Sequence, residues 1–198
     1  MDKEYLVNQL MNKAHQYDIE IDAQTLGKIV SLSVIRVFEK GSILRHIGDK
    51  TDSSGIVLSG LVRCYYIDDN GNDITRGFSI DGALCMDDGL FGYSESICEW
   101  EAIEETVLMI YNVGKIKELI SENEQLKNVY IKLLENALRY KIYRENGFLV
   151  ENATERYIHL RKLFPEICGR VSQQYIASYL GIAPESLSRI RKALKEQN

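Results

Sequence analysis

The chain has 198 residues, 45% of them hydrophobic and 27% charged, and it carries a formal net charge of −5 at pH 7. This length permits one large domain or two small ones, and the composition excludes a disordered chain. No apolar run approaches the roughly 18 residues of a membrane span, and the first residues lack the apolar centre of a signal peptide. We therefore expect a cytosolic protein with no membrane partner.

The spacing of cysteine and histidine indicates no metal site. The sequence contains no C-x-x-C pair, and its three histidines are widely separated. Zinc sites and metalloenzymes need such ligands at close, fixed spacing. We therefore expect reduced, mostly buried thiols, and we predict no metal site, no catalytic residue and no cofactor that the sequence identifies. The cysteines are Cys64, Cys85, Cys98 and Cys168.

The N-terminal part of the chain changes from a helical to a strand-like pattern. Residues 2–17 have apolar side chains at helical spacing, and Asp22 is a candidate N-cap for a second helix that ends near Ser31. Asn70-Gly71 is the strongest hairpin signal. Short β-branched and aromatic runs separated by turn residues predict a small antiparallel barrel or jelly roll. These runs are residues 34–38, 42–45, 55–58, 61–67, 97–98, 101–103 and 106–110.

The helical period returns near Asn112. Residues 115–120 predict a short helix, and Ser121 to Glu124 form a candidate capping box for a long helix that Gly147 ends or bends. Two apolar stripes run along the long helix, whereas a helix resting on one barrel needs only one. We predict that the first stripe, at coiled-coil spacing, forms a homodimer interface. The alternative is a helix buried wholly within its own subunit. The first stripe is Leu126, Tyr130, Leu133, Ala137 and Tyr140, and the second includes Leu134, Leu138 and Ile142.

The C-terminal stretch has a helix–turn–helix pattern. A helix over residues 152–164 is stopped by Pro165, and Ser172 can N-cap the next helix, over residues 173–180. Gly181 suits a left-handed turn, and Pro184 suits the first turn of a last helix. Such a turn between two helices is typical of DNA-binding domains, and the alternative is a purely structural helical hairpin. The expected small core is Ile176, Leu180, Ile182, Leu187 and Ile190.

One face of this last helix carries side chains suited to reading bases. Arg189 can bond guanine O6 and N7, Glu185 can accept from cytosine N4, and Ser188 can serve either base. Arg191, Lys192 and Lys195 are suited to phosphates. The alternative for Glu185 and Arg189 is a solvated ion pair. Residues 139–198 contain 11 Lys and Arg against 6 Asp and Glu, and residues 1–138 contain 13 against 23, so the basic surface is local to this end.

The motif Glu185-Ser-Leu-Ser188-Arg189 resembles the E-x-x-S-R motif of the FNR branch of the CRP/FNR family of bacterial transcription regulators. The resemblance covers nearly the whole chain and includes the turn and strand residues 41–42, 48–49 and 59–63. It implies an α+β fold in which an antiparallel β-roll or jelly roll, flanked by helices, forms a cyclic-nucleotide-binding-like sensor domain over residues 1–120. A dimerisation helix over 121–147 and a helix–turn–helix DNA-binding domain over 148–198 would follow.

The resemblance also implies the roles of single residues. Glu185, Ser188 and Arg189 would read a palindromic operator with a TTGAT-like core, and Ser172 and Gln174 would touch phosphates. The implied partners are double-stranded DNA and a second copy of the chain, with RNA polymerase as a further candidate. Family members usually carry a β-hairpin wing after the recognition helix, and we expect none here because the sequence ends first.

The effector is not identified. Members that bind cyclic AMP hold its phosphate with an arginine in a short cassette, and the position of that arginine falls near residues 96–98 here. Residues 77–114 contain no Lys or Arg and eight Asp or Glu. This stretch would repel a phosphodiester unless Arg63 or Arg76 reaches it, so we expect an effector that is not a cyclic nucleotide. No cysteine precedes Cys64, so we also expect no iron–sulfur sensor.

The sequence is compatible with several interpretations of the acidic stretch and of the whole chain. The acidic stretch is a solvated surface, a contact for polymerase or another protein, or a site for a neutral or cationic ligand or for a metal held by Asp87, Asp88 or Glu95. The alternative to a transcription regulator is a cupin-like barrel, enzymatic or ligand-binding, whose helical tail does not bind DNA. Cupin-like enzymes typically need a His/Glu metal set, and His46 is the only histidine in the β region.

Overall fold

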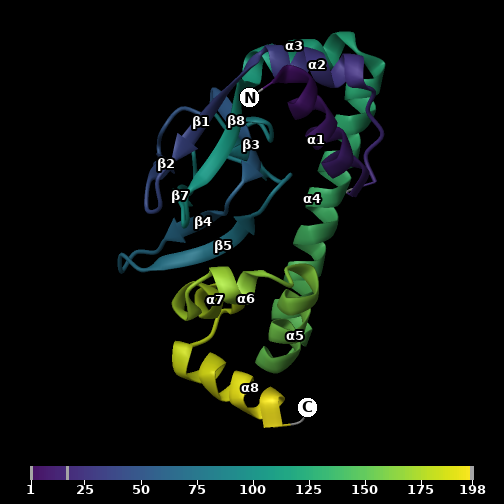
Figure 1. Ribbon diagram of the computed structural model, residues 1–198. Helices are drawn as coiled ribbons and strands as arrows, with labels where there is room; N and C mark the ends of the chain where they lie inside the picture. The colour runs from purple at the N-terminus through teal and green to yellow at the C-terminus, as the bar shows by residue number, and fades with distance from the viewer. Residues whose placement is uncertain (1, 17, 197–198) are drawn as a thin grey trace. The chain divides into compact units, whose positions relative to one another are not determined.

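The computed structural model describes residues 2–16 and 18–196, and these form two compact units (Figure 1). The N-terminal unit comprises residues 1–65 and 78–136, and the C-terminal unit comprises residues 66–77 and 137–198. Strands β4 and β5 and helix α4 contribute residues to both units. Within the described ranges, no helix combines the length and the apolar character that a membrane span requires.

Two four-stranded sheets form the predicted β-roll. Their strand orders are β1-β8-β3-β6 and β2-β7-β4-β5, and the β1–β8, β8–β3, β3–β6, β2–β7 and β7–β4 pairings are antiparallel. The predicted α+β fold with a jelly-roll-like β region is therefore confirmed. The strands are β1 (Ser33–Phe38), β2 (Ile43–Arg45), β3 (Ser53–Ser59), β4 (Val62–Ile67), β5 (Asp73–Ser79), β6 (Leu84–Cys85), β7 (Glu99–Ala102) and β8 (Thr106–Asn112).

Ser59-Gly60 forms the predicted turn between β3 and β4, and its geometry explains the need for glycine. Gly60 has a φ of +109°, and a Cβ at this position would lie 2.6 Å from the carbonyl oxygen of Glu105. A larger residue would therefore strain the backbone and collide with the opposite turn. The close approach lets the amide of Leu61 donate to Thr106 Oγ1 over 3.2 Å, and both residues are fully buried.

Two stretches between the strands differ from the sequence prediction. Residues 97–98, predicted as a strand, instead form a bend before β7, because Ser96 and Cys98 face Asp88 rather than a neighbouring strand. The short strand β6 and the 3₁₀ turn η1 (Asp87–Gly89) were not predicted, since neither is long enough to show a periodicity.

Helices α1 (Lys3–Gln16) and α2 (Ala23–Ser31) pack on the β-roll. The predicted N-cap is confirmed, because Asp22 Oδ1 accepts from the Thr25 amide over 2.6 Å, and this bond lowers the pKa of the Asp22 carboxyl. A cluster of buried apolar side chains joins the two helices to β8 and to the first turn of α4. The cluster contains Leu6, Val7, Leu10, Ile21, Leu26, Met109 and Leu126.

Helices α3 (Val113–Glu122) and α4 (Glu124–Val150) correct two details of the prediction. The predicted capping box at Ser121 does not form, because α3 continues through Ser121 and the Asn123 side chain instead accepts from the Leu126 amide over 3.0 Å. Gly147 does not end α4, which continues to Val150. Gly147 is buried, and a Cβ there would lie 3.3 Å from a carboxylate oxygen of Glu151, so its small size makes room for that side chain.

The C-terminal unit is built from the end of α4, four further helices and residues 66–77 of the β4–β5 hairpin. The hairpin residues are attached to α7 by Ser178, whose hydroxyl accepts from the Thr75 amide over 2.8 Å and donates to the Asp73 carbonyl oxygen over 3.2 Å. The short helix α6 was not predicted. The four helices are α5 (Ala153–Leu163), α6 (Ile167–Arg170), α7 (Gln173–Leu180) and α8 (Pro184–Glu196).

Candidate nucleic-acid interface and sensor interior

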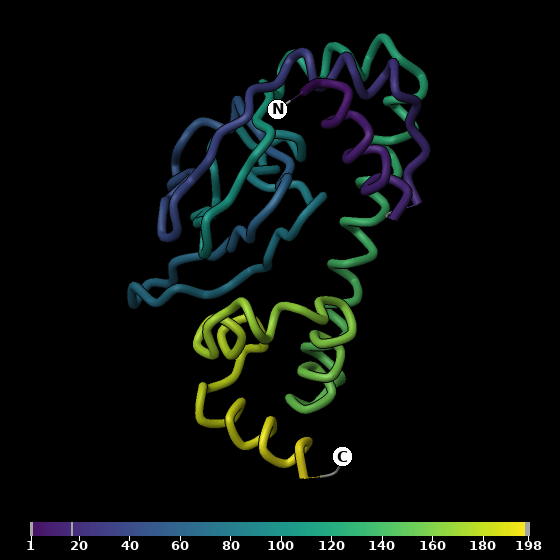
Figure 2. Tube along the Cα trace, in the orientation of Figure 1, coloured from purple at the N-terminus to yellow at the C-terminus, as the bar shows by residue number. Residues whose placement is uncertain are grey.

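The predicted helix–turn–helix is present in α7 and α8, as the trace in Figure 2 shows. Ser172 caps α7, its hydroxyl accepting from the Tyr175 amide over 3.2 Å. Gly181 follows with φ 67° and ψ 37°, the left-handed conformation that glycine adopts most easily, and Pro184 is the first residue of α8. The core between the helices is Ile176, Ala177, Leu180 and Leu187, all at most 1% exposed, with Ile182 and Ile190 half-buried.

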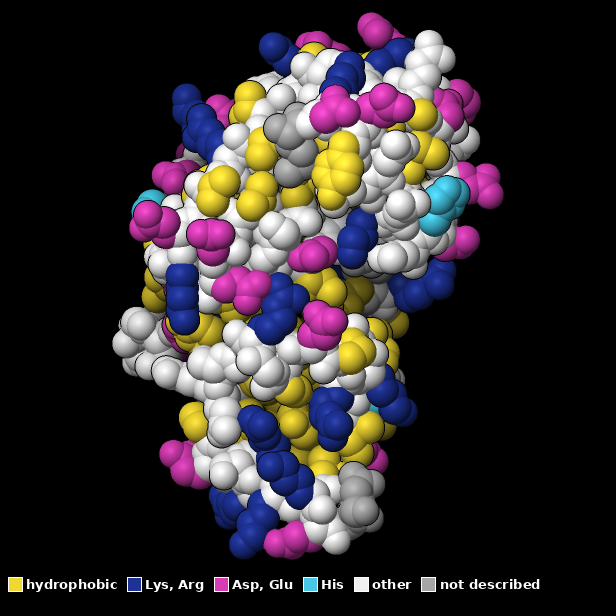
Figure 3. Space-filling model, in the orientation of Figure 1, with side chains coloured by type: hydrophobic (Ala, Val, Ile, Leu, Met, Phe, Trp, Pro, Cys, Tyr) yellow, Lys and Arg dark blue, Asp and Glu magenta, His cyan; other side chains and the backbone are white. Residues whose placement is uncertain are grey.

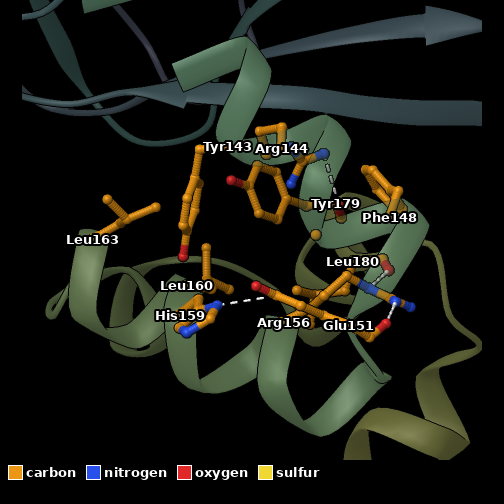
Figure 4. A pocket seen from close by; sticks show the side chains of 11 residues that line it. Tyr143, Arg144, Phe148, Glu151, Arg156, His159, Leu160, Leu163, Tyr179 and Leu180 are labelled. Carbon is orange, nitrogen blue, oxygen red and sulfur yellow. Dashed lines mark hydrogen bonds and ion pairs between the residues drawn. The ribbon is translucent and has the colours of Figure 1, made fainter. Parts of the chain in front are cut away.

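Two arginines hold the C-terminal end of α7 in place (Figure 4). Arg144 of α4 donates to the Tyr179 carbonyl oxygen over 3.0 Å and stacks 3.5 Å from the centre of the Tyr179 ring. Arg156 of α5 donates to the Leu180 carbonyl oxygen over 3.1 Å. Cations stabilise the carbonyl groups at a helix C-terminus, so these two arginines position the turn that leads into α8.

The predicted base-reading residues lie together on α8. Glu185, Ser188 and Arg189 are all exposed, and Leu187 between them is buried against α7. The Arg189 guanidinium donates to the Glu185 carbonyl oxygen over 3.4 Å and to the Ser186 hydroxyl over 3.3 Å. Its contact with Glu185 is therefore made through the backbone of that residue, not through the ion pair considered as an alternative. The arrangement is an exposed polar face at the start of a helix whose opposite face is buried.

The predicted phosphate-binding residues are placed less uniformly. Ser172 and Gln174 are exposed at the start of α7, and Lys192 is exposed and 4.0 Å from Glu196, whereas Arg191 is half-buried. Figure 3 shows dark blue Lys and Arg side chains gathered over the C-terminal helices on the face drawn. Residues 197 and 198, on which the expected absence of a wing depends, lie outside the described part of the chain.

The two apolar stripes of α4 have different surroundings. In the first stripe, Leu126 is 2% exposed within its own chain, and the Tyr130 hydroxyl donates to the Leu90 carbonyl oxygen over 2.6 Å. The Tyr140 hydroxyl shares a 2.8 Å hydrogen bond with that of Tyr179, and Leu133 and Ala137 are half-buried. Contacts within the chain therefore occupy much of the stripe predicted as a dimer interface. The second stripe is exposed: Leu134 by 36%, Leu138 by 61% and Ile142 by 57%, with Ile131 alongside at 53%.

Within the β-roll, Arg45 is a buried cation. The charge count along residues 77–114 did not include it, because it lies earlier in the sequence. It is 4% exposed and donates to the Met86 carbonyl oxygen over 2.9 Å and to the Ser53 hydroxyl over 2.9 Å. Burial lowers the pKa of the Arg45 guanidinium, and the negative charge of Asp88 opposes this shift. Asp88 is 2% exposed and accepts from the Ser96 hydroxyl over 2.9 Å and from Trp100 Nε1 over 3.1 Å.

A second buried arginine does reach the acidic stretch. Arg63 is 1% exposed, lies 3.6 Å from a carboxylate oxygen of Glu101, and stacks 4.2 Å from the centre of the Tyr65 ring. Glu99 is also buried and bonds His46 Nδ1 and the Ile47 amide, each over 3.0 Å. The interpretation of the stretch as a solvated surface is therefore wrong for part of it, because the pairing of β4 with β7 brings Arg63 beside Glu101, and Asp88 is buried near Arg45.

The N-terminal unit also has an open surface cavity of about 480 Å³ that the sequence did not indicate. Lys50 and Lys117 line it together with Asp52 and Glu95, so it carries both signs of charge. The Lys117 ammonium donates to the Gly89 carbonyl oxygen over 2.7 Å. Among the described residues, no three His, Cys, Asp or Glu side chains are grouped so as to hold a metal ion.

Comparison with known proteins agrees with this architecture. Residues 35–123 match the cyclic nucleotide-binding domain family. FixK2 from Bradyrhizobium japonicum is similar over 83% of this chain and 85% of its own, with 19% identity and a TM-score of 0.72. CLP from Xanthomonas campestris, described as a c-di-GMP-responsive global regulator, is similar over 89% and 93%, with 17% identity and a TM-score of 0.71.

The catabolite activator protein of Thermus thermophilus is similar over 96% of this chain and 87% of its own, with 20% identity and a TM-score of 0.59. No curated protein matches the chain by sequence. Residues 35–123 are therefore similar to the cyclic nucleotide-binding domain family, and the chain has the fold of the CRP/FNR transcription regulators.

Proposed function

We propose that the protein is a homodimeric, sequence-specific DNA-binding transcription regulator whose sensor domain responds to an effector other than a cyclic nucleotide. The observation that carries the proposal is the exposed face of α8 formed by Glu185, Ser188 and Arg189. Recognition helices contact base edges with residues near their N-termini, where these three side chains lie.

Arg189 is the proposed reader of guanine in a TTGAT-like half-site. Its guanidinium can donate to O6 and N7 of that base, and Glu185 can accept from N4 of the cytosine on the opposite strand. The present contacts of Arg189, 3.4 and 3.3 Å long at an exposed position, are weak enough for a base edge to replace. Ser188 lies on the same face and can contact an adjacent base.

The phosphate contacts are assigned to exposed polar groups beside this face. Ser172 and Gln174 lie at the N-terminal end of α7, where the helix dipole favours an anion. Lys192 and the half-buried Arg191 follow the reading residues along α8. Arg144 and Arg156 are excluded from this set because both donate to the backbone of α7 or its neighbours.

The dimer is assigned to the exposed stripe of α4. Ile131, Leu134, Leu138 and Ile142 recur every three or four residues, and a helix buries such a stripe against a partner. The proposed partner is a second copy of the chain. The proposed interface is this exposed stripe, in place of the first stripe, which the sequence favoured. A two-fold dimer then presents two recognition helices roughly 34 Å apart, about one turn of DNA.

The sensor assignment rests on the positions of the charged groups. Arg45 and Arg63, the buried cations of the β-roll described above, are engaged by carbonyl oxygens, Ser53 and Glu101, and the residues at the position of the phosphate-binding arginine are Ser96, Ile97 and Cys98. An incoming cyclic phosphodiester would have to displace one of these internal partners. RNA polymerase remains a candidate further partner of the acidic residues that are exposed.

The experiment that tests the DNA-binding proposal is a selection of operators from randomised double-stranded DNA, repeated with the Arg189→Ala variant. We expect inverted repeats with half-sites about 10–11 base pairs apart, centre to centre, each with a TTGAT-like core. The variant should lose the preference at the guanine. Recovery of direct repeats, or an unchanged guanine preference in the variant, would show that the reading face is assigned wrongly.

A further inference from the structure

Two of the four thiols lie together inside the N-terminal unit. Cys64 is in β4 and Cys98 directly precedes β7, and their sulfur atoms are 3.1 Å apart. Cys64 is 3% exposed and Cys98 is fully buried. The two residues are 34 positions apart in the sequence, and the antiparallel pairing of Cys64 with Trp100 in β7 brings them together.

A carboxylate lies beside this pair of thiols. The Asp88 carboxylate oxygens are 3.7 and 3.9 Å from the Cys98 sulfur. The side chains of Ser96 and Trp100 both donate to Asp88 Oδ2, so the carboxylate is fixed in this position. Asp88 is thus placed to accept the proton that Cys98 must lose before its sulfur can act as a nucleophile.

The pair is close to the geometry of a disulfide and close to the surface. A disulfide has its sulfur atoms about 2.05 Å apart, so an approach of roughly 1 Å is enough. Ile97, the neighbour of Cys98, is 42% exposed, and Cys98 therefore lies directly beneath the surface. Reaching it requires only the local opening of a bend that belongs to no strand.

The other two cysteines have different surroundings. Cys85 in β6 is fully buried, and burial raises the pKa of its thiol. Cys168 belongs to the C-terminal unit, where its sulfur is 3.8 Å from the Tyr157 hydroxyl. These two thiols provide matched references within the same chain.

We propose that Cys64 and Cys98 form a redox site that hydrogen peroxide oxidises to a disulfide and that a dithiol reduces back to two thiols. Cys98 transfers its proton to Asp88, and the thiolate attacks one oxygen of hydrogen peroxide, so that the O–O bond breaks and the leaving hydroxide takes that proton back from Asp88 to become water. Cys64 sulfur then attacks the sulfenic sulfur of Cys98, the S–O bond breaks, and the hydroxide leaves as water with the Cys64 proton. Two thiols are oxidised and one peroxide is reduced to two waters.

This bond would form inside the β-roll of the N-terminal unit. Cys98 shares the buried Asp88 carboxylate with Ser96 and Trp100. A bond from Cys98 to β4 would hold this segment in one position. The disulfide itself can be measured without DNA, so its test is independent of the proposed function.

The experiment oxidises the full-length reduced protein with hydrogen peroxide, stops the reaction with catalase, denatures the protein and alkylates the remaining thiols. Intact mass should show two alkylated cysteines in place of four, and peptide mapping should find Cys64 linked to Cys98. Dithiothreitol should restore all four thiols. Four alkylatable thiols after oxidation, a link that joins other cysteines, or overoxidised Cys98 beside a free Cys64 would each overturn the proposal.

Matched single-cysteine variants distinguish a specific Cys64–Cys98 disulfide from unspecific oxidation of the thiols. Cys85→Ser and Cys168→Ser should each still lose two thiols on oxidation and keep one, whereas Cys98→Ser should keep all three of its thiols. Circular dichroism checks that each variant is folded, and the peptide map of the wild type decides the question if Cys98→Ser is not. Loss of the disulfide in Cys85→Ser would assign the reactive pair to other cysteines.

Discussion

In the β-roll, Arg45 and Arg63 are 4% and 1% exposed and are engaged by oxygen atoms of their own chain. In α8, by contrast, Arg189 and Lys192 extend into solvent. The same residue types therefore serve two purposes. The buried cations bond oxygen atoms inside the β-roll, and the exposed ones are accessible to an anion in solvent. A charge count along the sequence cannot distinguish these purposes, because it adds both kinds together.

The apolar residues of α4 follow the same division. Leu126 is packed in the core of its own chain, whereas Leu138, three turns further along, is 61% exposed. The first stripe is largely occupied by contacts within its own chain, and the exposed stripe is the one that a second copy can cover. The predictions that follow test whether exposed groups act between molecules and buried groups act within one.

The largest expected effect is on the dimer. Leu138→Glu should convert the protein to a monomer, because an uncompensated charge costs about 3–5 kcal/mol when buried and two-fold symmetry places two of them in one interface. Sedimentation velocity at micromolar concentration measures the change. Arg139→Glu reverses a charge at an exposed position off the stripe and should leave the dimer intact. A wild type that sediments as a monomer would contradict the assignment of this stripe.

The next effect concerns the buried cation. Arg45→Met should lower the free energy of unfolding by about 3–5 kcal/mol, because it leaves buried carbonyl oxygens without their donor and Asp88 without a nearby positive charge. Urea denaturation monitored by tryptophan fluorescence reports this, since Trp100 bonds Asp88. The exposed counterpart Arg36→Met should change stability by no more than about 0.5 kcal/mol. Equal free energies of unfolding for the two variants would contradict the prediction that the buried arginine stabilises the fold more than the exposed one.

Arg189→Ala tests the exposed cation most directly. It should weaken operator binding by about 1–3 kcal/mol per half-site and relax the preference at one base pair, because a bidentate contact to guanine is lost. Fluorescence anisotropy with matched operators that differ at this base pair measures both quantities. Protein stability should not change, as Arg189 makes only surface contacts. A uniform loss on all sequences would assign Arg189 to phosphate instead.

A smaller effect is expected for Lys192→Ala. Loss of one phosphate contact should weaken binding to all sequences alike and reduce the slope of log K against log salt by about 0.9. Anisotropy titrations between low and physiological salt measure the slope. Lys28, exposed on α2 in the N-terminal unit, offers the control, because Lys28→Ala should leave the slope unchanged. A sequence-dependent loss in Lys192→Ala would make it a base contact.

The smallest expected signal is the binding of cyclic AMP. Titration calorimetry should detect no sub-millimolar binding of cyclic AMP or cyclic GMP, because the arginines near the acidic stretch already have internal partners. The measurement uses the full-length reduced protein. Sub-millimolar binding of either nucleotide would mean that Arg63 or Arg45 gives up its internal contact to the phosphate.

Much of the helix–turn–helix could be predicted because its signals are local. Ser172, Gly181 and Pro184 each occupy the position that their backbone chemistry favours, and the structure confirms all three. One error, at the start of α4, arose where two local signals competed. Ser121 and Asn123 are both good N-caps, and the choice fell to Asn123 because α3 continues to Glu122.

The sequence by itself determined the order of elements, the helix–turn–helix and the face of α8 that carries Glu185 and Arg189, because helical periodicity and capping depend on residues within a few positions of one another. Tertiary structure alone decided which stripe of α4 is exposed and which acids of the β-roll are neutralised. It also placed Cys64 beside Cys98, 34 positions away. These features depend on strand pairing and on which surfaces meet, and no spacing along the chain encodes them.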